Sequence, residues 1–147
     1  MAQFTRTAEA VWHGTGLEGS GTLTGPSGVL NNTPYSTQKR FQNADGTLGT
    51  NPEELIAAAH AGCFIMALSF KLTGAGFAPE ALHCKAHLHM DKSGNDWFVA
   101  SISLELDANV PGIDPALFQE LANAAKSTCP VSKALSAVPI ELTATLA

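Results

Sequence analysis

Apolar residues recur along this chain in two ways, at every second position in some stretches and at helical spacing in others. Before residue 50, short apolar pieces at residues 10–12, 22–24 and 28–30 alternate with glycine-rich segments. This spacing predicts two or three short antiparallel strands joined by turns. Residues 38–41 could finish a strand or lie in a loop. Residues 43–50 contain Asp-Gly and a further glycine, a composition typical of a loop.

The apolar stretch at residues 55–72 has helical character and is by far the longest in the chain. Thr50 or Asn51 can cap its start, Pro52 suits the first turn, and the two carboxylates that follow suit the positive end of the helix dipole. The predicted helix ends near residues 74–76. Because its residues are apolar nearly all round, we expect it to be buried centrally.

The second half of the chain returns to strand-like alternation. Residues 82–90 and 98–106 alternate on either side of a turn at 93–96, which predicts a hairpin, and residues 140–146 alternate again. Asp114–Pro115 opens a second helix, and Pro130 interrupts it before a short helical piece. The order of strands, long helix, hairpin, helix and strand predicts an α+β fold, with a mostly antiparallel sheet packed on the long helix.

Length and charge narrow the class of protein. A chain of 147 residues predicts one domain, residues 1–147, and no internal repeat or linker divides it. The net charge is −5 with only eight Lys and Arg, so binding to nucleic acid is not expected. No apolar run is expected to span a membrane, and the first 14 residues lack a signal-peptide core. We therefore expect a cytoplasmic protein, in which three cysteines do not form a structural disulfide framework.

Each cysteine lies in a different predicted setting. Cys63, within the apolar helix, has the surroundings of a buried, inert core thiol. Cys129 precedes Pro130, so it could be a small residue capping the next helix or a thiol whose pKa is lowered by the helix dipole. Cys84 lies on the apolar face of a predicted strand and is expected in the core.

Histidines near these thiols raise the alternative of a zinc site. His83, His87 and His89 share one face of a predicted strand, and His60 precedes Cys63 by three residues. The chain has no Cys-x-x-Cys and no His-Glu-x-x-His, so histidines on a solvated strand face are the simpler interpretation. We expect no metal.

Arg40 and Glu53 are candidates for controlling a reactive thiol. Arg40 is one of two arginines and lies just before the long helix, which Glu53 opens. A guanidinium could stabilise a thiolate and donate hydrogen bonds to a peroxide, and a carboxylate could hold it in place. The simpler alternatives are an exposed loop arginine and a carboxylate that only stabilises the helix dipole.

In order along nearly the whole chain, several segments resemble the family of osmotically inducible protein C and organic hydroperoxide resistance proteins (OsmC/Ohr). The two most specific matches are residues 50–63, Thr-Asn-Pro-Glu-Glu-Leu-Ile-Ala-Ala-Ala-His-Ala-Gly-Cys, and residues 129–132, Cys-Pro-Val-Ser. Further matches are Gly-Val-Leu-Asn at 28–31, Pro-Tyr at 34–35, Arg-Phe at 40–41 and Val-Pro-Gly-Ile at 110–113. Ala-His-Ala before the cysteine and Gly-Val-Leu-Asn are closer to the OsmC branch.

The resemblance implies a two-cysteine peroxidase of the OsmC-like fold. It implies that Cys63 is the peroxidatic cysteine and Cys129 the resolving cysteine, that Arg40 stabilises the Cys63 thiolate, and that Glu53 positions Arg40. It also implies an intertwined homodimer, organic hydroperoxides as preferred substrates, no cofactor, and re-reduction by dithiols such as lipoyl groups on partner proteins. Phe41, Phe64 and Met66 are expected to line the substrate pocket. A redox sensor that oxidises without sustained turnover remains the alternative.

Overall fold

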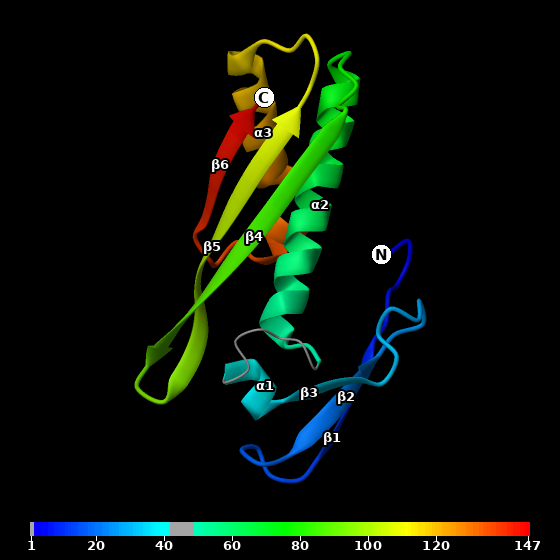
Figure 1. Cartoon of the computed structure of the whole chain (residues 1–147), viewed down its shortest axis with the longest axis vertical. Coiled ribbons are helices and arrows are strands. Elements are labelled where there is room, and N and C mark those ends of the chain that lie inside the picture. Colours follow the sequence, from blue (N-terminus) through cyan, green and yellow to red (C-terminus); the bar gives the residue numbers. More distant parts are fainter. Residues whose placement is uncertain (1, 42–48) are drawn as a thin grey trace. The chain divides into compact units, whose positions relative to one another are not determined.

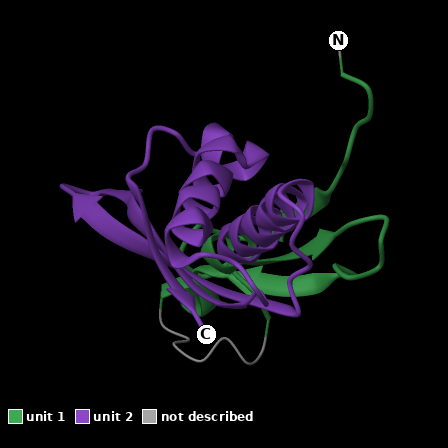
Figure 2. Cartoon of the chain, turned by 90° about the horizontal axis from the view of Figure 1, so that it is seen from above, with its two compact units in different colours: residues 1–55 green, residues 56–147 purple. Residues whose placement is uncertain are grey.

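The computed structural model describes residues 2–41 and 49–147 and divides into two compact units, residues 1–55 and 56–147 (Figure 2). Helix α2 (Pro52–Gly74) begins in the first unit and continues through the second. The single domain expected over residues 1–147 stays a prediction.

The first unit is built around a three-stranded antiparallel sheet. Its strands are β1 (Glu9–His13), β2 (Ser20–Thr24) and β3 (Thr33–Ser36), in the order β1-β2-β3, and helix α1 (Thr37–Phe41) follows directly. Gly21 pairs with both Trp12 and Tyr35, whose rings lie 5.4 Å apart between centroids. A side chain at Gly21 would collide with the Tyr35 ring, so the aromatic contact requires glycine here.

Two expectations for this unit are corrected or completed by the structure. Residues 28–30 form bends rather than the expected strand, because Gly28 and Asn32 adopt positive φ angles of 84° and 48°, which a strand does not accommodate. Residues 38–41, expected as strand or loop, belong to α1. Most of the expected loop at 43–50 lies outside the described residues.

In the second unit, α2 and α3 (Pro115–Thr128) cover one face of a mixed sheet (Figures 1 and 2). Strands β4 (Ala81–Ser93) and β5 (Asp96–Asn109) form the expected hairpin, turning at Gly94 with a φ of 61°. Strand β6 (Ile140–Leu146) pairs parallel to β5, giving the order β4-β5-β6. The predicted α+β class with largely antiparallel sheets and a long helix is confirmed.

The core of this unit comes from alternating positions on β5 and spaced positions on the helices. Its fully buried apolar residues include Phe64, Leu68 and Leu72 from α2, Ile102 and Leu106 from β5, and Phe118 and Ala122 from α3. Phe98, expected on the same face of β5, is 45% exposed. It lies beyond a register shift opposite His89 and Met90 of β4. Past this shift the side chains of β5 no longer alternate between a buried and an exposed face.

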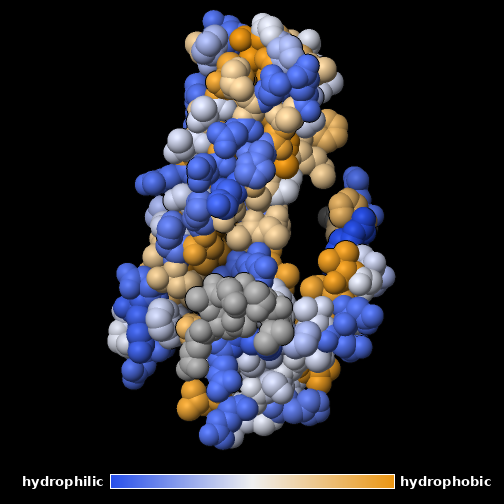
Figure 3. Space-filling view, in the orientation of Figure 1, coloured by the Kyte–Doolittle hydropathy of each residue, from blue (hydrophilic) through white to orange (hydrophobic). Residues whose placement is uncertain are grey.

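The expected all-round burial of α2 is wrong within this chain. Its buried residues recur every fourth position and include Phe64 and Leu68, whereas Met66 and Phe70 are 64% and 74% exposed. Apolar surface over α2 is visible in Figure 3. With 23 residues, α2 is also long and apolar enough to cross a membrane, contrary to the expectation from the sequence. That is weak support for a span, because a core helix meets the same criteria and α2 carries core residues.

Candidate active site

Cys63 and Cys129 come together although 66 residues separate them in the sequence (129 − 63). Cys63 lies midway along α2. Cys129 ends α3 and is the N-cap of the short helix α4 (Pro130–Ala134), with Pro130 in its first turn. The two thiols lie near enough to change each other's ionisation, and both are free. Two free thiols close together are what a two-cysteine redox site needs before oxidation.

The surroundings of the two thiols affect their ionisation in opposite directions. Burial raises the pKa of Cys63, and the hydrogen bond with Cys129 adds to the rise. Burial also acts to raise the pKa of Cys129, but hydrogen bonds from Cys63 and Ser132 outweigh it, so the pKa of Cys129 is lowered. When the pair loses one proton, this environment therefore favours the charge on Cys129, with the Cys63 thiol as donor.

A buried histidine lies beside this pair. The imidazole Nε2 of His60 is 2.8 Å from the hydroxyl of Ser132, and the two residues are 0% and 6% exposed. Ser132 in turn acts on Cys129, lowering the pKa of its thiol. Burial lowers the pKa of His60, so the imidazole is neutral at neutral pH.

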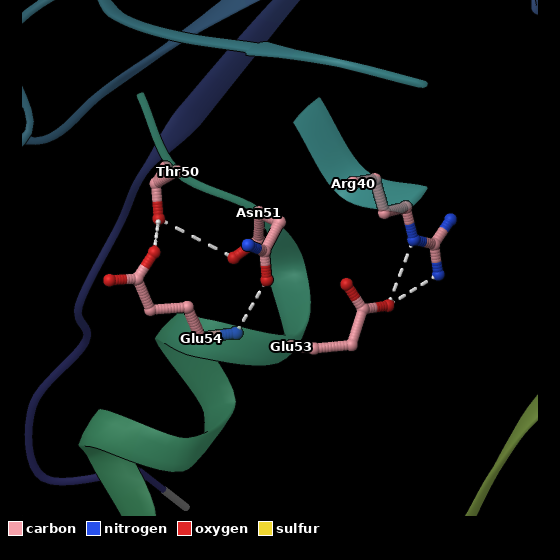
Figure 4. Close-up of polar contacts among 5 residues, drawn as sticks. All are labelled: Arg40, Thr50, Asn51, Glu53 and Glu54. Atoms are coloured by element: carbon pink, nitrogen blue, oxygen red, sulfur yellow. Dashed lines mark hydrogen bonds and ion pairs between the residues drawn. The ribbon is translucent and has the colours of Figure 1, made fainter. Parts of the chain in front are cut away.

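Arg40 and Glu53 form an ion pair within the first unit (Figure 4). The arginine Nε and Nη2 donate to the same carboxylate oxygen, Oε1, at 2.9 and 2.6 Å. The guanidinium also lies over the Phe41 ring, 5.0 Å from its centroid. The predicted partnership of Arg40 with Glu53 is therefore present, and Glu53 has a partner beyond the helix dipole.

The start of α2 is held by its own capping contacts. Asn51 Oδ1 accepts a hydrogen bond from the Glu54 amide at 2.8 Å, and the Thr50 hydroxyl donates to the Glu54 carboxylate at 3.0 Å (Figure 4). Of the two predicted capping residues, Asn51 caps the helix, and Thr50 contacts the side chain of Glu54 instead. These contacts fix the first turn of α2, from which Glu53 reaches Arg40.

Comparison with known proteins agrees with the resemblance found in the sequence. Residues 44–143, more than half of the chain, match the family model described as "OsmC-like protein". The chain belongs to the OsmC-like family. It is 45% identical to the peroxiredoxin OsmC of Escherichia coli (strain K12) over 129 residues, 88% of either chain.

Relatives from the hydroperoxide-resistance branch are more distant. The organic hydroperoxide resistance protein of Xanthomonas axonopodis pv. citri is 36% identical over 115 residues, 76% of each chain. The crystal structure of OhrB from Bacillus subtilis superposes with a TM-score of 0.70 at 30% identity, covering 98% of this chain and 100% of that one. The expected OsmC/Ohr fold, with the OsmC branch favoured, is confirmed.

The three expected pocket residues of this OsmC-like chain lie in different surroundings. Met66 lines an open groove of about 370 Å³ in the second unit, together with Gly62 and Ile65. Phe41 lines a separate hollow in the first unit. Phe64 is fully buried in the core. The structure does not place these three side chains around one described pocket, so their role in binding substrate stays a prediction.

Cys84 and the strand histidines lie apart from the thiol pair on the sheet. Cys84 packs against the core as expected, and burial raises its pKa to about 11. His87 contacts Glu105 at 3.1 Å and stacks near His89. Among the described residues, no group of three or more His, Cys, Asp or Glu side chains is arranged to hold a metal.

Ser132 is the site residue that sequence reasoning missed. It belongs to the Cys-Pro-Val-Ser segment of the resemblance, which implies no role for it, and His60 entered the sequence analysis only as a candidate zinc ligand. The available signal was position: Ser132 is three residues after an N-cap cysteine, and so lies on the same turn.

Proposed function

We propose that this chain is a two-cysteine thiol peroxidase that reduces organic hydroperoxides to alcohols, and hydrogen peroxide less well, in the cytoplasm. The observation that carries the proposal is the pair of free thiols at Cys63 and Cys129, which lie close enough to act on each other's ionisation. Family membership supports it, since relatives carry the names peroxiredoxin OsmC and organic hydroperoxide resistance protein. We also propose a role in oxidative and osmotic stress defence, of which the names of these relatives support the peroxide-related part.

The proposed cycle has three balanced steps. The Cys63 thiolate attacks the outer peroxide oxygen, the O–O bond breaks, and the alkoxide takes a proton to leave as an alcohol, so that Cys63 becomes a sulfenic acid. The Cys129 sulfur then attacks the Cys63 sulfur and releases the hydroxyl group, with one proton, as water. An external dithiol, such as a lipoyl group on a partner protein, reduces the resulting disulfide. The cycle needs no cofactor.

Arg40 and Glu53 have proposed roles in the first step. Arg40 would stabilise the Cys63 thiolate and orient the peroxide, and Glu53 would hold the guanidinium. A cation is needed, because burial raises the pKa of Cys63 and Cys129 competes for the charge. The ion pair between Arg40 and Glu53 supports a guanidinium held in a defined orientation.

The thiol assignment is tested with cumene hydroperoxide, using dihydrolipoamide as reductant. We expect wild type and Cys84→Ser to sustain consumption and Cys63→Ser to show none. Without reductant, Cys129→Ser should consume one equivalent and leave a trapped sulfenic acid on Cys63, detectable with a dimedone-type probe. Sustained wild-type rates in Cys63→Ser would refute the proposal. Oxidation of wild type without turnover would instead favour a redox sensor.

The Arg40 assignment has its own matched variant. Arg40→Lys keeps the charge but loses the planar set of donors, so we expect kcat/KM for the peroxide to fall about tenfold to a hundredfold, the loss of one charged hydrogen bond. Glu53→Gln should give a smaller loss. If Arg40→Lys reacts at the wild-type rate, the orienting role of Arg40 is wrong.

We also propose that the functional form is a homodimer. The exposed apolar side chains of α2, Met66 and Phe70, support an interface that a second copy covers. Light scattering should give twice the chain mass of 15.3 kDa. Neither nucleic acid nor a membrane is a proposed partner.

A further inference from the structure

Two polar residues without an assigned role are buried next to the thiol pair. His60 projects from α2 and Ser132 from α4, 72 positions apart, and they meet at 2.8 Å with almost no exposure to solvent. A buried imidazole costs free energy unless it is hydrogen-bonded, and a leucine could fill similar space. The contact therefore needs an explanation beyond packing.

The unpaired nitrogen of His60 fixes the direction of the hydrogen bond. Nδ1 has no partner among the described residues, whereas Nε2 faces the Ser132 hydroxyl. An imidazole buried in its neutral form carries one proton, and a buried N–H without an acceptor is costlier than an unused lone pair. The proton therefore lies on Nε2, which donates to Ser132 Oγ. The Ser132 hydroxyl proton is then free to donate elsewhere.

The remaining donor of Ser132 is directed at Cys129. Cys129 is the N-cap of α4, and Ser132 stands three residues later on the same turn. Both residues are buried, and the Ser132 side chain and the amides of Val131 and Ser132 all act on the Cys129 thiol in the direction that lowers its pKa. The buried polar groups thus lead from His60 through Ser132 to Cys129.

We propose that His60 and Ser132 form a relay that stabilises the Cys129 thiolate for its attack on oxidised Cys63, an inference that rests on the function proposed above. Ser132 touches the reacting sulfur, and His60 is a positioning residue that acts through Ser132. In the step served, the S–H bond of Cys129 and the S–O bond of Cys63 break, the S–S bond forms, and the proton leaves with the hydroxyl group as water. The relay takes up no electrons.

The groups acting on Cys129 also show why the relay serves this thiol. From α2 the sulfur faces Cys63, from α4 it faces the Ser132 hydroxyl and two amides, and His60 acts through that hydroxyl. Every one of these contacts lowers the pKa of Cys129, against the effect of burial. Burial keeps His60 neutral, so it contributes a dipole and no charge.

The first test measures the pKa of Cys129 without any peroxide chemistry. In a Cys63→Ala, Cys84→Ala background, Cys129 is the sole thiol, and its thiolate is followed by ultraviolet absorbance during a pH titration. We expect Ser132→Ala to raise the pKa by about one unit, as the loss of a hydrogen bond to a charged group predicts. His60→Leu should raise it less. The control is Ser136→Ala, an exposed serine after α4 that should leave it unchanged.

The second test follows disulfide formation in the otherwise native chain by stopped-flow after one equivalent of peroxide. Raising the pKa of Cys129 by one unit leaves about a tenth of its thiolate but makes that thiolate about threefold more nucleophilic. Below the pKa of Cys129, disulfide formation in Ser132→Ala should therefore be about threefold slower than in wild type. Above the pKa the variant should match or exceed wild type. Formation of the sulfenic acid on Cys63 should not slow, because weaker stabilisation of the charge on Cys129 leaves the Cys63 thiolate at least as populated.

These readouts separate the relay from the proposed peroxidase. An unchanged pKa of Cys129 in Ser132→Ala, or a variant equally slow at every pH, would overturn the relay even if the protein reduces peroxides. If wild type consumes no peroxide, the peroxidase proposal fails by itself. The pKa titration would then still support or overturn the hydrogen-bond relay, because it uses no peroxide.

Discussion

At the scale of single residues, the three cysteines show how local surroundings assign different chemistry to one side chain. Cys63 and Cys129 affect each other's ionisation; the Val131 amide lowers the pKa of both thiols, and Ser132 acts on Cys129 alone. Cys84 packs against the core from β4, where burial is the largest influence on its pKa. Reactivity follows the thiolate population, so these differences are measurable.

Cys84 should be the least reactive thiol in the folded protein. With a pKa of about 11, against an ordinary value of 9.0, its thiolate population at a pH near 8 is lower by about a hundredfold. Alkylation with iodoacetamide, followed by peptide mass spectrometry, should therefore label Cys84 at about a hundredth of its rate in denaturant. Equal rates in the folded and unfolded chain would show that the strand does not protect it.

Residue-level chemistry was predictable only in part from the sequence. The resemblance supplied Cys63, Cys129, Arg40 and Glu53, and the structure brings each of these two pairs into contact. Ser132 was missed, because a sequence does not show which distant side chain a serine meets. Since 72 residues separate it from His60, only the fold reveals that contact.

At the scale of elements, α3 matters because its end places Cys129. Asp114 caps the helix from an extended conformation, accepting hydrogen bonds from the amides of Ala116 and Leu117 at 3.0 and 3.1 Å. The helix then buries Phe118 and Ala122 against the sheet and ends at Cys129. Its capping therefore contributes to the stability of the element that ends at Cys129, the proposed resolving cysteine.

Removal of this cap should destabilise the protein by a predictable amount. We expect Asp114→Ala to lower the free energy of unfolding by about 1 kcal/mol, measured by urea denaturation, because two amides of the first turn lose their acceptor. Asp114→Asn retains an acceptor oxygen and should lose much less. Equal losses in the two variants would assign the effect to the charge and not to the cap.

The elements were predictable where side-chain periodicity was regular. Alternation gave the strands at 82–90 and 140–146, and proline and glycine marked the turns between helices. The pattern failed at 28–30, where positive φ angles nearby break the strand. It also failed for the burial of α2, because an all-round apolar pattern does not distinguish core from a surface that another subunit could cover.

At the scale of the whole molecule, the buried contact between His60 and Ser132 links the stability of the fold to pH. His60 lies wholly within the protein and is joined to α4 by its only described hydrogen bond. Burial lowers the pKa of His60 in the folded state below the ordinary 6.5. Just below pH 6.5, the unfolded chain therefore binds a proton at His60 and the folded chain does not. The same contact that serves Cys129 in our proposal should therefore make folding sensitive to mild acid.

The free energy of unfolding should fall as pH decreases through 6.5. Above pH 6.5, His60 is unprotonated in both the folded and the unfolded chain, so its full contribution to the free energy of unfolding is present. Between pH 6.5 and the lower folded-state pKa, protonation of His60 in the unfolded chain lowers the free energy of unfolding by up to about 1.4 kcal/mol per pH unit.

In His60→Gln this part of the pH dependence of the free energy of unfolding should vanish, although the variant is less stable at neutral pH. Urea denaturation of both proteins across this pH range isolates the effect, since the remaining histidines are common to both. Identical slopes would mean that His60 titrates alike in the folded and unfolded chain, and so is not held neutral beside Ser132.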